Sequence, residues 1–100
     1  MDALFKLLQK IRIRPTLYLG EYSLNNLFFT IVGYTDRARE EDPMYHDCVE
    51  GFDEYVHEVY SDNSTGNYVT ILTANTSSDK EALEKFFELL DEFVALKERK

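Results

Sequence analysis

The residues best suited to acid–base or metal chemistry lie near the middle of this 100-residue chain. Asp53 and His57 are four positions apart, so a helix would place a carboxylate and an imidazole on one face, as a ligand pair or an acid–base pair requires. Two ligands do not complete a metal site, and the other histidine, His46, is eleven residues before His57. We therefore expect no metal and no cofactor, and we interpret His57 as a solvated histidine on an acidic helix.

Nucleophilic catalysis has equally little support in the sequence. Cys48 is the one cysteine, and its neighbours Asp47 and Glu50 disfavour the reactive thiolate form. A single cysteine excludes an internal disulfide, which fits a reducing compartment. The sequence has no Gly-x-Ser-x-Gly turn, no Cys-x-x-Cys pair and no glycine-rich phosphate loop. We predict that the chain is not an enzyme.

An acidic tract is the main charge feature of the chain. Between Glu40 and Asp62 there are nine acidic residues and no lysine or arginine, whereas the first 20 residues hold four bases and one acid. The formal charge of -8 argues against nucleic acid or anionic lipid as the main partner and favours a basic partner. Because a charge run is often only a solvated face, binding and solvation both stay open at this point.

Helical periodicity predicts the elements that position these residues. Apolar residues recur every three or four positions in residues 2–13, 24–38 and 79–94. Asp2, Ser23 and Ser78 stand at expected helix N-caps, and Ser78 with Glu81 fits a capping box. No apolar run approaches the roughly 20 residues that a bilayer span requires, so we expect no membrane contact and a cytoplasmic protein.

A further helix is expected after Pro43. Its apolar stripe consists of Val49, Phe52, Val56 and Val59, and acidic residues at the same spacings form the opposite face. We predict that this face binds a partner. The candidate residues are Asp47, Glu50, Asp53, Glu54, Glu58 and Tyr55.

Residues 68–74 favour a strand by composition, but a lone strand would have no pairing partner, so a short helix is the preferred prediction. The sequence therefore predicts an all-α fold, a compact single-domain bundle of about five helices over residues 1–100. The predicted core contains Leu27, Phe28, Phe52, Val56, Phe86, Phe87, Leu90 and Phe93.

A motif of apolar and turn residues precedes the second predicted helix. Since Pro15 disfavours helical geometry at Arg14, residues 14–22 are expected to run extended, with Leu17 and Leu19 buried. Gly20 permits a turn, and Gly33 suggests close approach of another backbone. Arg14 is expected to pair with a carboxylate such as Asp91 or Glu92. The motif residues are Arg14, Pro15, Tyr18, Gly20, Ser23 and Gly33, and we interpret them as structural.

The run Arg14-Pro15-Thr16-Leu17-Tyr18-Leu19-Gly20, with Ser23-Leu24, Leu27 and Gly33-Tyr34, resembles the RPxMYLG signature of a family of small bacterial proteins. Residues 86–93 are similar to that family's FFELLDEF ending, and Gly51-Phe52 with Tyr55-Val56 matches its middle helix. Thr16 and Leu17 stand where the family has Gly-Met, and Tyr68 where Trp is common. Some relatives are immunity proteins of contact-dependent or polymorphic toxin systems, which implies a toxin-neutralising role.

A similar RPxMYIG segment occurs in type II topoisomerase ATPase domains. Those enzymes also need an Asp-x-Gly-x-Gly turn against the nucleotide, which is absent from this chain of four glycines. We therefore expect an immunity protein that binds a cognate toxin domain, a basic nuclease, through its acidic surface. The alternatives are an acidic nucleic-acid mimic or regulator that binds a basic host protein, and a small enzyme.

Overall fold

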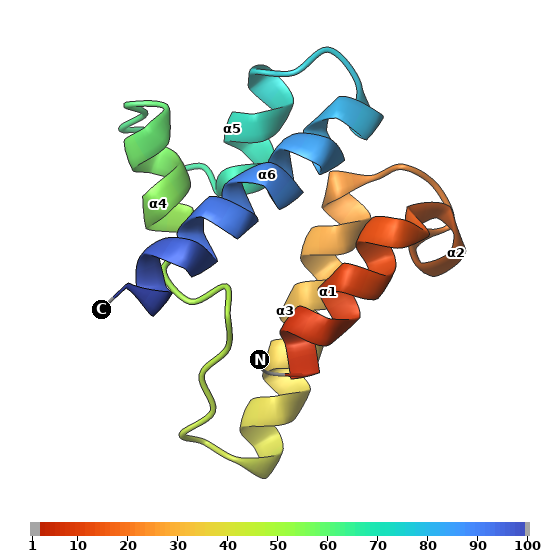
Figure 1. Ribbon diagram of the computed structural model, residues 1–100, viewed down its shortest axis with the longest axis vertical. Coiled ribbons are helices and arrows are strands. Elements are labelled where there is room, and N and C mark those ends of the chain that lie inside the picture. Colours follow the sequence, from red (N-terminus) through yellow and green to blue (C-terminus); the bar gives the residue numbers. More distant parts are fainter. Residues whose placement is uncertain (1–2, 100) are drawn as a thin grey trace. The chain divides into compact units, whose positions relative to one another are not determined.

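The computed structural model describes residues 3–99, and helices are the only regular secondary structure within that range (Figure 1). The prediction of an all-α fold is therefore confirmed, with a helix also at residues 68–74. There are six helices in the described range rather than about five. They are α1 (Ala3–Ile13), α2 (Pro15–Leu19), α3 (Leu24–Glu41), α4 (Phe52–Val59), α5 (Tyr68–Ala74) and α6 (Asp79–Glu98).

The chain divides into two compact units, Met1–Cys48 and Val49–Lys100. The first contains α1, α2 and α3, and the second contains α4, α5 and α6. The prediction of one domain over residues 1–100 stays a prediction.

The first unit has the predicted amphipathic helices. In α1 the buried residues are Leu4, Leu8 and Ile11, which follow the three-to-four spacing of the sequence pattern. Ser23 caps α3 as expected, since its hydroxyl oxygen accepts a hydrogen bond from Asn26 N–H at 3.0 Å. The expected cap at Asp2 lies outside the described residues.

The extended connector predicted for residues 14–22 is wrong, because α2 forms there. Arg14 is non-helical (φ -134°), as its position before Pro15 requires, but the proline itself occupies the first helical position, where no N–H donor is needed. Gly20 ends α2 with φ 82°, and its N–H donates to Thr16 O. As a result Leu19 is buried, while Leu17 and Tyr18 are exposed.

Two further expectations in the first unit need correction. Among the described residues of the first unit, a Cβ atom at Gly33 would meet no atom within 4 Å apart from its chain neighbours and its own helix backbone, so the expected close approach of another backbone is not found there. Phe28 is only half-buried rather than part of the core. Arg14 is exposed, and its expected pairing with Asp91 or Glu92, which belong to the other unit, stays a prediction.

The helix expected after Pro43 begins only at Phe52. Before it, Asp42 Oδ1 accepts a hydrogen bond from Met44 N–H, and Tyr45 N–H donates to Asp42 O, so the chain turns instead of continuing as a helix. Gly51, with φ 85°, precedes α4 and interrupts helical geometry. The predicted apolar stripe is therefore shorter, and Val59 at its end is exposed.

An aromatic cluster organises the second unit, in which α4, α5 and α6 contact one another. The Phe52 ring of α4 lies 5.2 Å from the Tyr68 ring of α5, 5.2 Å from the Phe86 ring and 5.6 Å from the Phe93 ring of α6, in edge-to-face geometry. The predicted burial of Phe52, Val56, Phe86, Phe87, Leu90 and Phe93 is confirmed.

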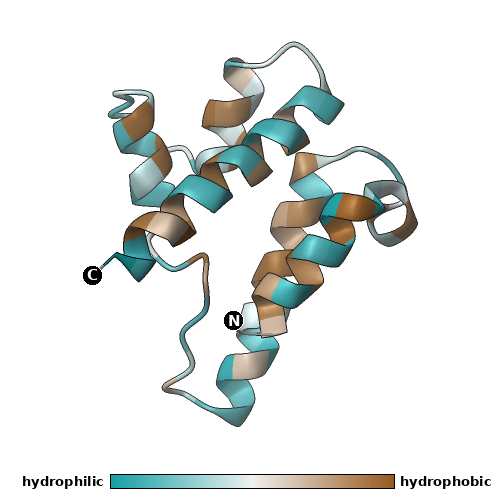
Figure 2. Cartoon of the chain, in the orientation of Figure 1, coloured by the Kyte–Doolittle hydropathy of each residue, from teal (hydrophilic) through white to brown (hydrophobic). Residues whose placement is uncertain are grey.

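Helix α6 is the longest element of the second unit. The Ser78 hydroxyl oxygen accepts a hydrogen bond from Glu81 N–H at 3.1 Å, as predicted, while the Glu81 carboxylate accepts one from the Ser77 hydroxyl. Hydrophobic and hydrophilic residues alternate along the helix with the period of an amphipathic element (Figure 2).

Of the helices in residues 3–99, none has the length and apolar character needed to cross a membrane.

Candidate functional site

The acidic face predicted from the sequence is centred on α4. Glu54 and Glu58 are exposed and four residues apart, so both carboxylates project from one side of this helix. Glu50 is exposed in the turn before α4. Asp53 is exposed as well, but its Oδ1 accepts a hydrogen bond from Tyr68 N–H at 2.8 Å, which fixes the start of α5 against α4. The structure thus brings together four of the five predicted acids.

Asp47 does not belong to this face. It lies in the first unit, is only 7% exposed, and its Oδ2 accepts a hydrogen bond from the Thr35 hydroxyl at 2.7 Å. Its neighbour Tyr45 packs with Tyr34 at a ring distance of 6.4 Å, so this segment returns along α3. The expectation that Asp47 lies on an exposed face is therefore corrected, because this buried carboxylate is bonded to a hydroxyl and holds two segments of the first unit together. Its part in binding a partner stays a prediction.

Tyr55 links the acidic face to α6. Its ring packs 5.3 Å from the Phe93 ring, and its hydroxyl donates to Glu92 Oε2 at 3.3 Å. Partial burial, followed by the negative charge of Glu92, raises the pKa of Tyr55 above 10.0, so the hydroxyl stays protonated and remains a donor at neutral pH. The ring is half-buried, with one side available at the surface.

A shallow hollow lies between α4 and α6 beside Tyr55. Its lining includes the apolar side chains of Phe93 and Leu96 and the carboxylates of Glu54 and Glu58. Leu96 is 44% exposed, which leaves an apolar surface open between charged groups. Lys97 also lines the hollow, and its Nζ lies 4.7 Å from the Phe93 ring centroid and donates to Glu50 O at 3.0 Å. A surface that combines exposed apolar side chains with charged ones has a composition found at protein-binding surfaces.

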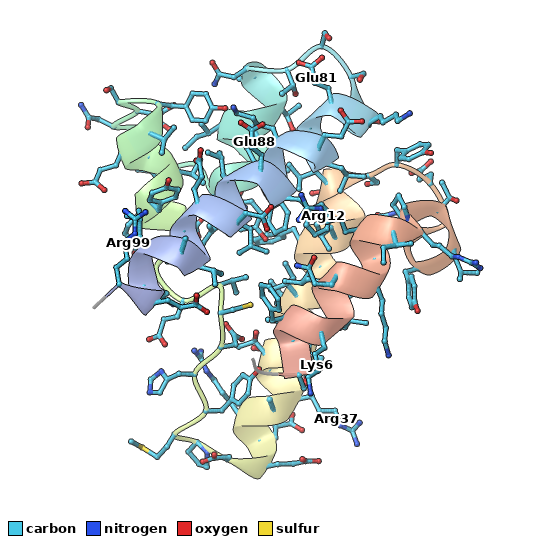
Figure 3. All side chains as sticks on the ribbon, in the orientation of Figure 1. Lys6, Arg12, Arg37, Glu81, Glu88 and Arg99 are labelled. Carbon is cyan, nitrogen blue, oxygen red and sulfur yellow. The ribbon has the colours of Figure 1, made fainter. Side chains whose placement is uncertain are left out.

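Sequence reasoning missed the contribution of α6 to this surface. Glu92 and Leu96 are four residues apart on α6, so the helical period could have placed them on one face. The contact between this face of α6 and α4 arises from tertiary packing, so the helical period alone does not predict it. Figure 3 labels Glu81 and Glu88, two further exposed acids of α6; Lys85 Nζ forms an ion pair with Glu88 at 3.3 Å.

His57 is not the solvated side chain that the sequence suggested. Its Nδ1 lies 2.7 Å from Asp62 O and its Nε2 lies 2.7 Å from Gly66 O, so both ring nitrogens are engaged by backbone carbonyls. Neither nitrogen is therefore available as a metal ligand. Among the described residues, no group of three or more His, Cys, Asp or Glu side chains is arranged to hold a metal ion.

Charge is distributed unevenly between the two units. Residues 1–48 contain seven acids and six bases, whereas residues 49–100 contain twelve acids and five bases. Almost all of the net charge of -8 therefore belongs to the unit that carries the α4 surface. Comparisons of the chain with protein-family models, with curated proteins and with solved structures found no match.

Proposed function

We propose that this chain is an immunity protein that binds a cognate bacterial toxin domain and neutralises it without chemistry of its own. The observation that carries the proposal is the acidic, partly apolar surface formed by Glu54, Tyr55 and Glu58 of α4 with Glu92 and Leu96 of α6. The resemblance of the RPTLYLG segment and of residues 86–93 to a family that includes immunity proteins supports the same role.

The chemistry of the surface fits a basic partner. A nuclease toxin must attract a polyanion, so its cleft carries positive charge. The exposed carboxylates of this chain are attracted by the same positive charge and can compete with nucleic acid for the cleft. Long-range attraction raises the association rate, while contacts that exclude water, such as those to Tyr55 and Leu96, slow dissociation. In this role the chain acts in the cytoplasm, where an imported or newly made nuclease meets nucleic acid.

The protection of cells tests the proposal. The probe is the C-terminal toxin domain of an exported protein encoded beside this chain, expressed with and without the chain. We expect growth to be restored by this chain and not by an unrelated acidic protein of equal charge. Growth arrest in the presence of the folded chain would contradict the proposal.

A nucleic-acid mimic that binds a basic host protein is the second candidate. The exposed acids along α6, among them Glu81, Glu84 and Glu88, favour this candidate. Acids three or four residues apart on a helix form a row of negative charges about 5 to 6 Å apart, and such a row can stand in for the row of phosphates along a nucleic-acid strand. A mimic would compete with DNA or RNA for several basic proteins. It would give no protection against one particular toxin.

A further inference from the structure

The loop that follows α4, residues 61–67, is fixed at its start by the end of that helix. Ser61 N–H donates to Glu58 O at 3.2 Å, and Asp62 N–H donates to His57 O at 2.9 Å. These two bonds form a Schellman motif, which requires a left-handed residue after the helix. Ser61 has this conformation, with φ 50°, although glycine adopts it more readily. The turn therefore contains some backbone strain that other contacts must offset.

The His57 side chain closes the same loop onto α4. Its Nδ1 faces Asp62 O and its Nε2 faces Gly66 O, each at 2.7 Å. Backbone carbonyl oxygens can only accept hydrogen bonds, so both ring nitrogens must donate. A neutral imidazole has one N–H, and only the imidazolium ion has two. The geometry around His57 therefore selects its protonated form.

We propose that protonated His57 is a clamp that holds loop 61–67 closed, and that loss of its proton releases the loop. Without the proton, one ring nitrogen presents a lone pair to a carbonyl lone pair at hydrogen-bonding distance, which is repulsive. One of the two attachments must then open. The strained turn at Ser61 and the short segment from Asp62 to Gly66 move with it.

The charges around His57 favour the clamped state. Together with His57, the carboxylates of Asp53, Glu54 and Glu58 on α4 and of Asp62 in the loop line one open hollow. The hydrogen bond to Asp62 O is the main cause that raises the pKa of His57 above 6.5, against a lowering by partial burial. Because this pKa is raised, the clamp contributes stability below pH 6.5 and loses it as the pH rises through the folded-state value.

The clamp bears on the candidate surface because His57 is on the same helix as Glu54 and Glu58. In the closed form the loop lines the open hollow that His57 shares with Glu54 and Glu58, which is a different hollow from the one beside Tyr55, and the imidazolium reduces the negative charge there. In the released form the surface gains a unit of negative charge and a mobile edge. This consequence for a partner rests on the proposed function, whereas the clamp itself is measured on the free protein.

The test is an NMR titration of the ¹⁵N-labelled full chain between about pH 5 and about pH 9. The ring ¹⁵N shifts report the protonation of His57, and backbone ¹⁵N relaxation reports the mobility of residues 61–67. We expect His57 to titrate above 6.5 and the loop to become mobile over the same pH range. Titration at or below 6.5, or loop mobility that is constant through the titration, would overturn the inference.

Two variants separate the clamp from general effects of pH. His57→Gln should abolish the pH dependence of loop mobility, whereas the matched substitution His46→Gln at the other histidine should keep it. If His57→Gln does not fold, the titration of the unmodified chain decides the matter alone. No toxin is needed for these measurements, so their failure leaves the proposed function standing, and failed protection in cells leaves the clamp standing.

Discussion

Replacement of Phe52 by alanine tests the packing that positions the candidate surface. Phe52 is 0% exposed, and its ring contacts Tyr68 of α5 and both Phe86 and Phe93 of α6. Removal of a buried phenylalanine costs about 3 to 5 kcal/mol. Since three edge-to-face pairs are lost together, each worth about 0.5 to 1.5 kcal/mol, we expect a value near the upper end. That is a large share of the roughly 5 to 15 kcal/mol that stabilises a typical domain.

Urea denaturation followed by circular dichroism and tyrosine fluorescence measures this loss, because the chain has seven tyrosines and no tryptophan. Phe52→Leu keeps much of the apolar volume and should cost only about 1 to 2 kcal/mol, which provides a folded variant if the alanine variant unfolds. Phe29→Ala is the matched control: Phe29 is 61% exposed, so its loss should cost under about 1 kcal/mol. Equal destabilisation by Phe52→Ala and Phe29→Ala would refute the assigned packing.

Three further substitutions test individual features by the same assay. Ser61→Gly should stabilise the protein by up to about 1 kcal/mol, because glycine adopts the left-handed backbone conformation of residue 61 without strain. Ser64→Gly, at a residue without positive φ, should not stabilise the protein, and equal effects of the two substitutions would contradict the turn geometry. Ser78→Ala should cost about 1 kcal/mol through loss of the α6 cap, and Ser77→Ala clearly less. Asp47→Ala should lower the free energy of unfolding by about 1 to 3 kcal/mol and leave partner binding unchanged. Weakened binding without loss of stability would show instead that Asp47 contacts the partner.

The elements with strong local signals were predictable from the sequence. Helix α6 has an apolar stripe over many turns and a serine cap, and both signals are local. Helix α5 was predicted because a strand at residues 68–74 would have had no partner. Helix α2 was missed because proline before a short apolar run fits an extended segment as well as the first turn of a helix.

The candidate site was predictable only in part, for a different reason. The helical period correctly predicted that Glu54 and Glu58 lie on one exposed side of a helix. It also assigned Asp47 to that side, because the period does not show that Gly51 interrupts the helix. The proximity of Glu92 to Tyr55 joins residues 37 positions apart and arises from tertiary packing. The partners of His57 are backbone carbonyls, which no residue type reveals.

Charge reversal on α4 gives the most direct measurement of the central claim that the acidic surface binds the toxin domain. The association rate of the toxin domain proposed as the partner is measured for the unmodified chain, for Glu54→Lys with Glu58→Lys, and for Asp36→Lys with Glu40→Lys. The second pair is a matched control, since both residues are exposed, four positions apart and on α3, and the change in charge is the same.

We expect the α4 pair to slow association by about tenfold or more and the α3 pair to leave it nearly unchanged. The difference should shrink as added salt shortens the Debye length from about 10 Å at 0.1 M toward about 3 Å at 1 M. Equal association rates for the two double variants at low salt would contradict the claim that the α4 surface meets the toxin.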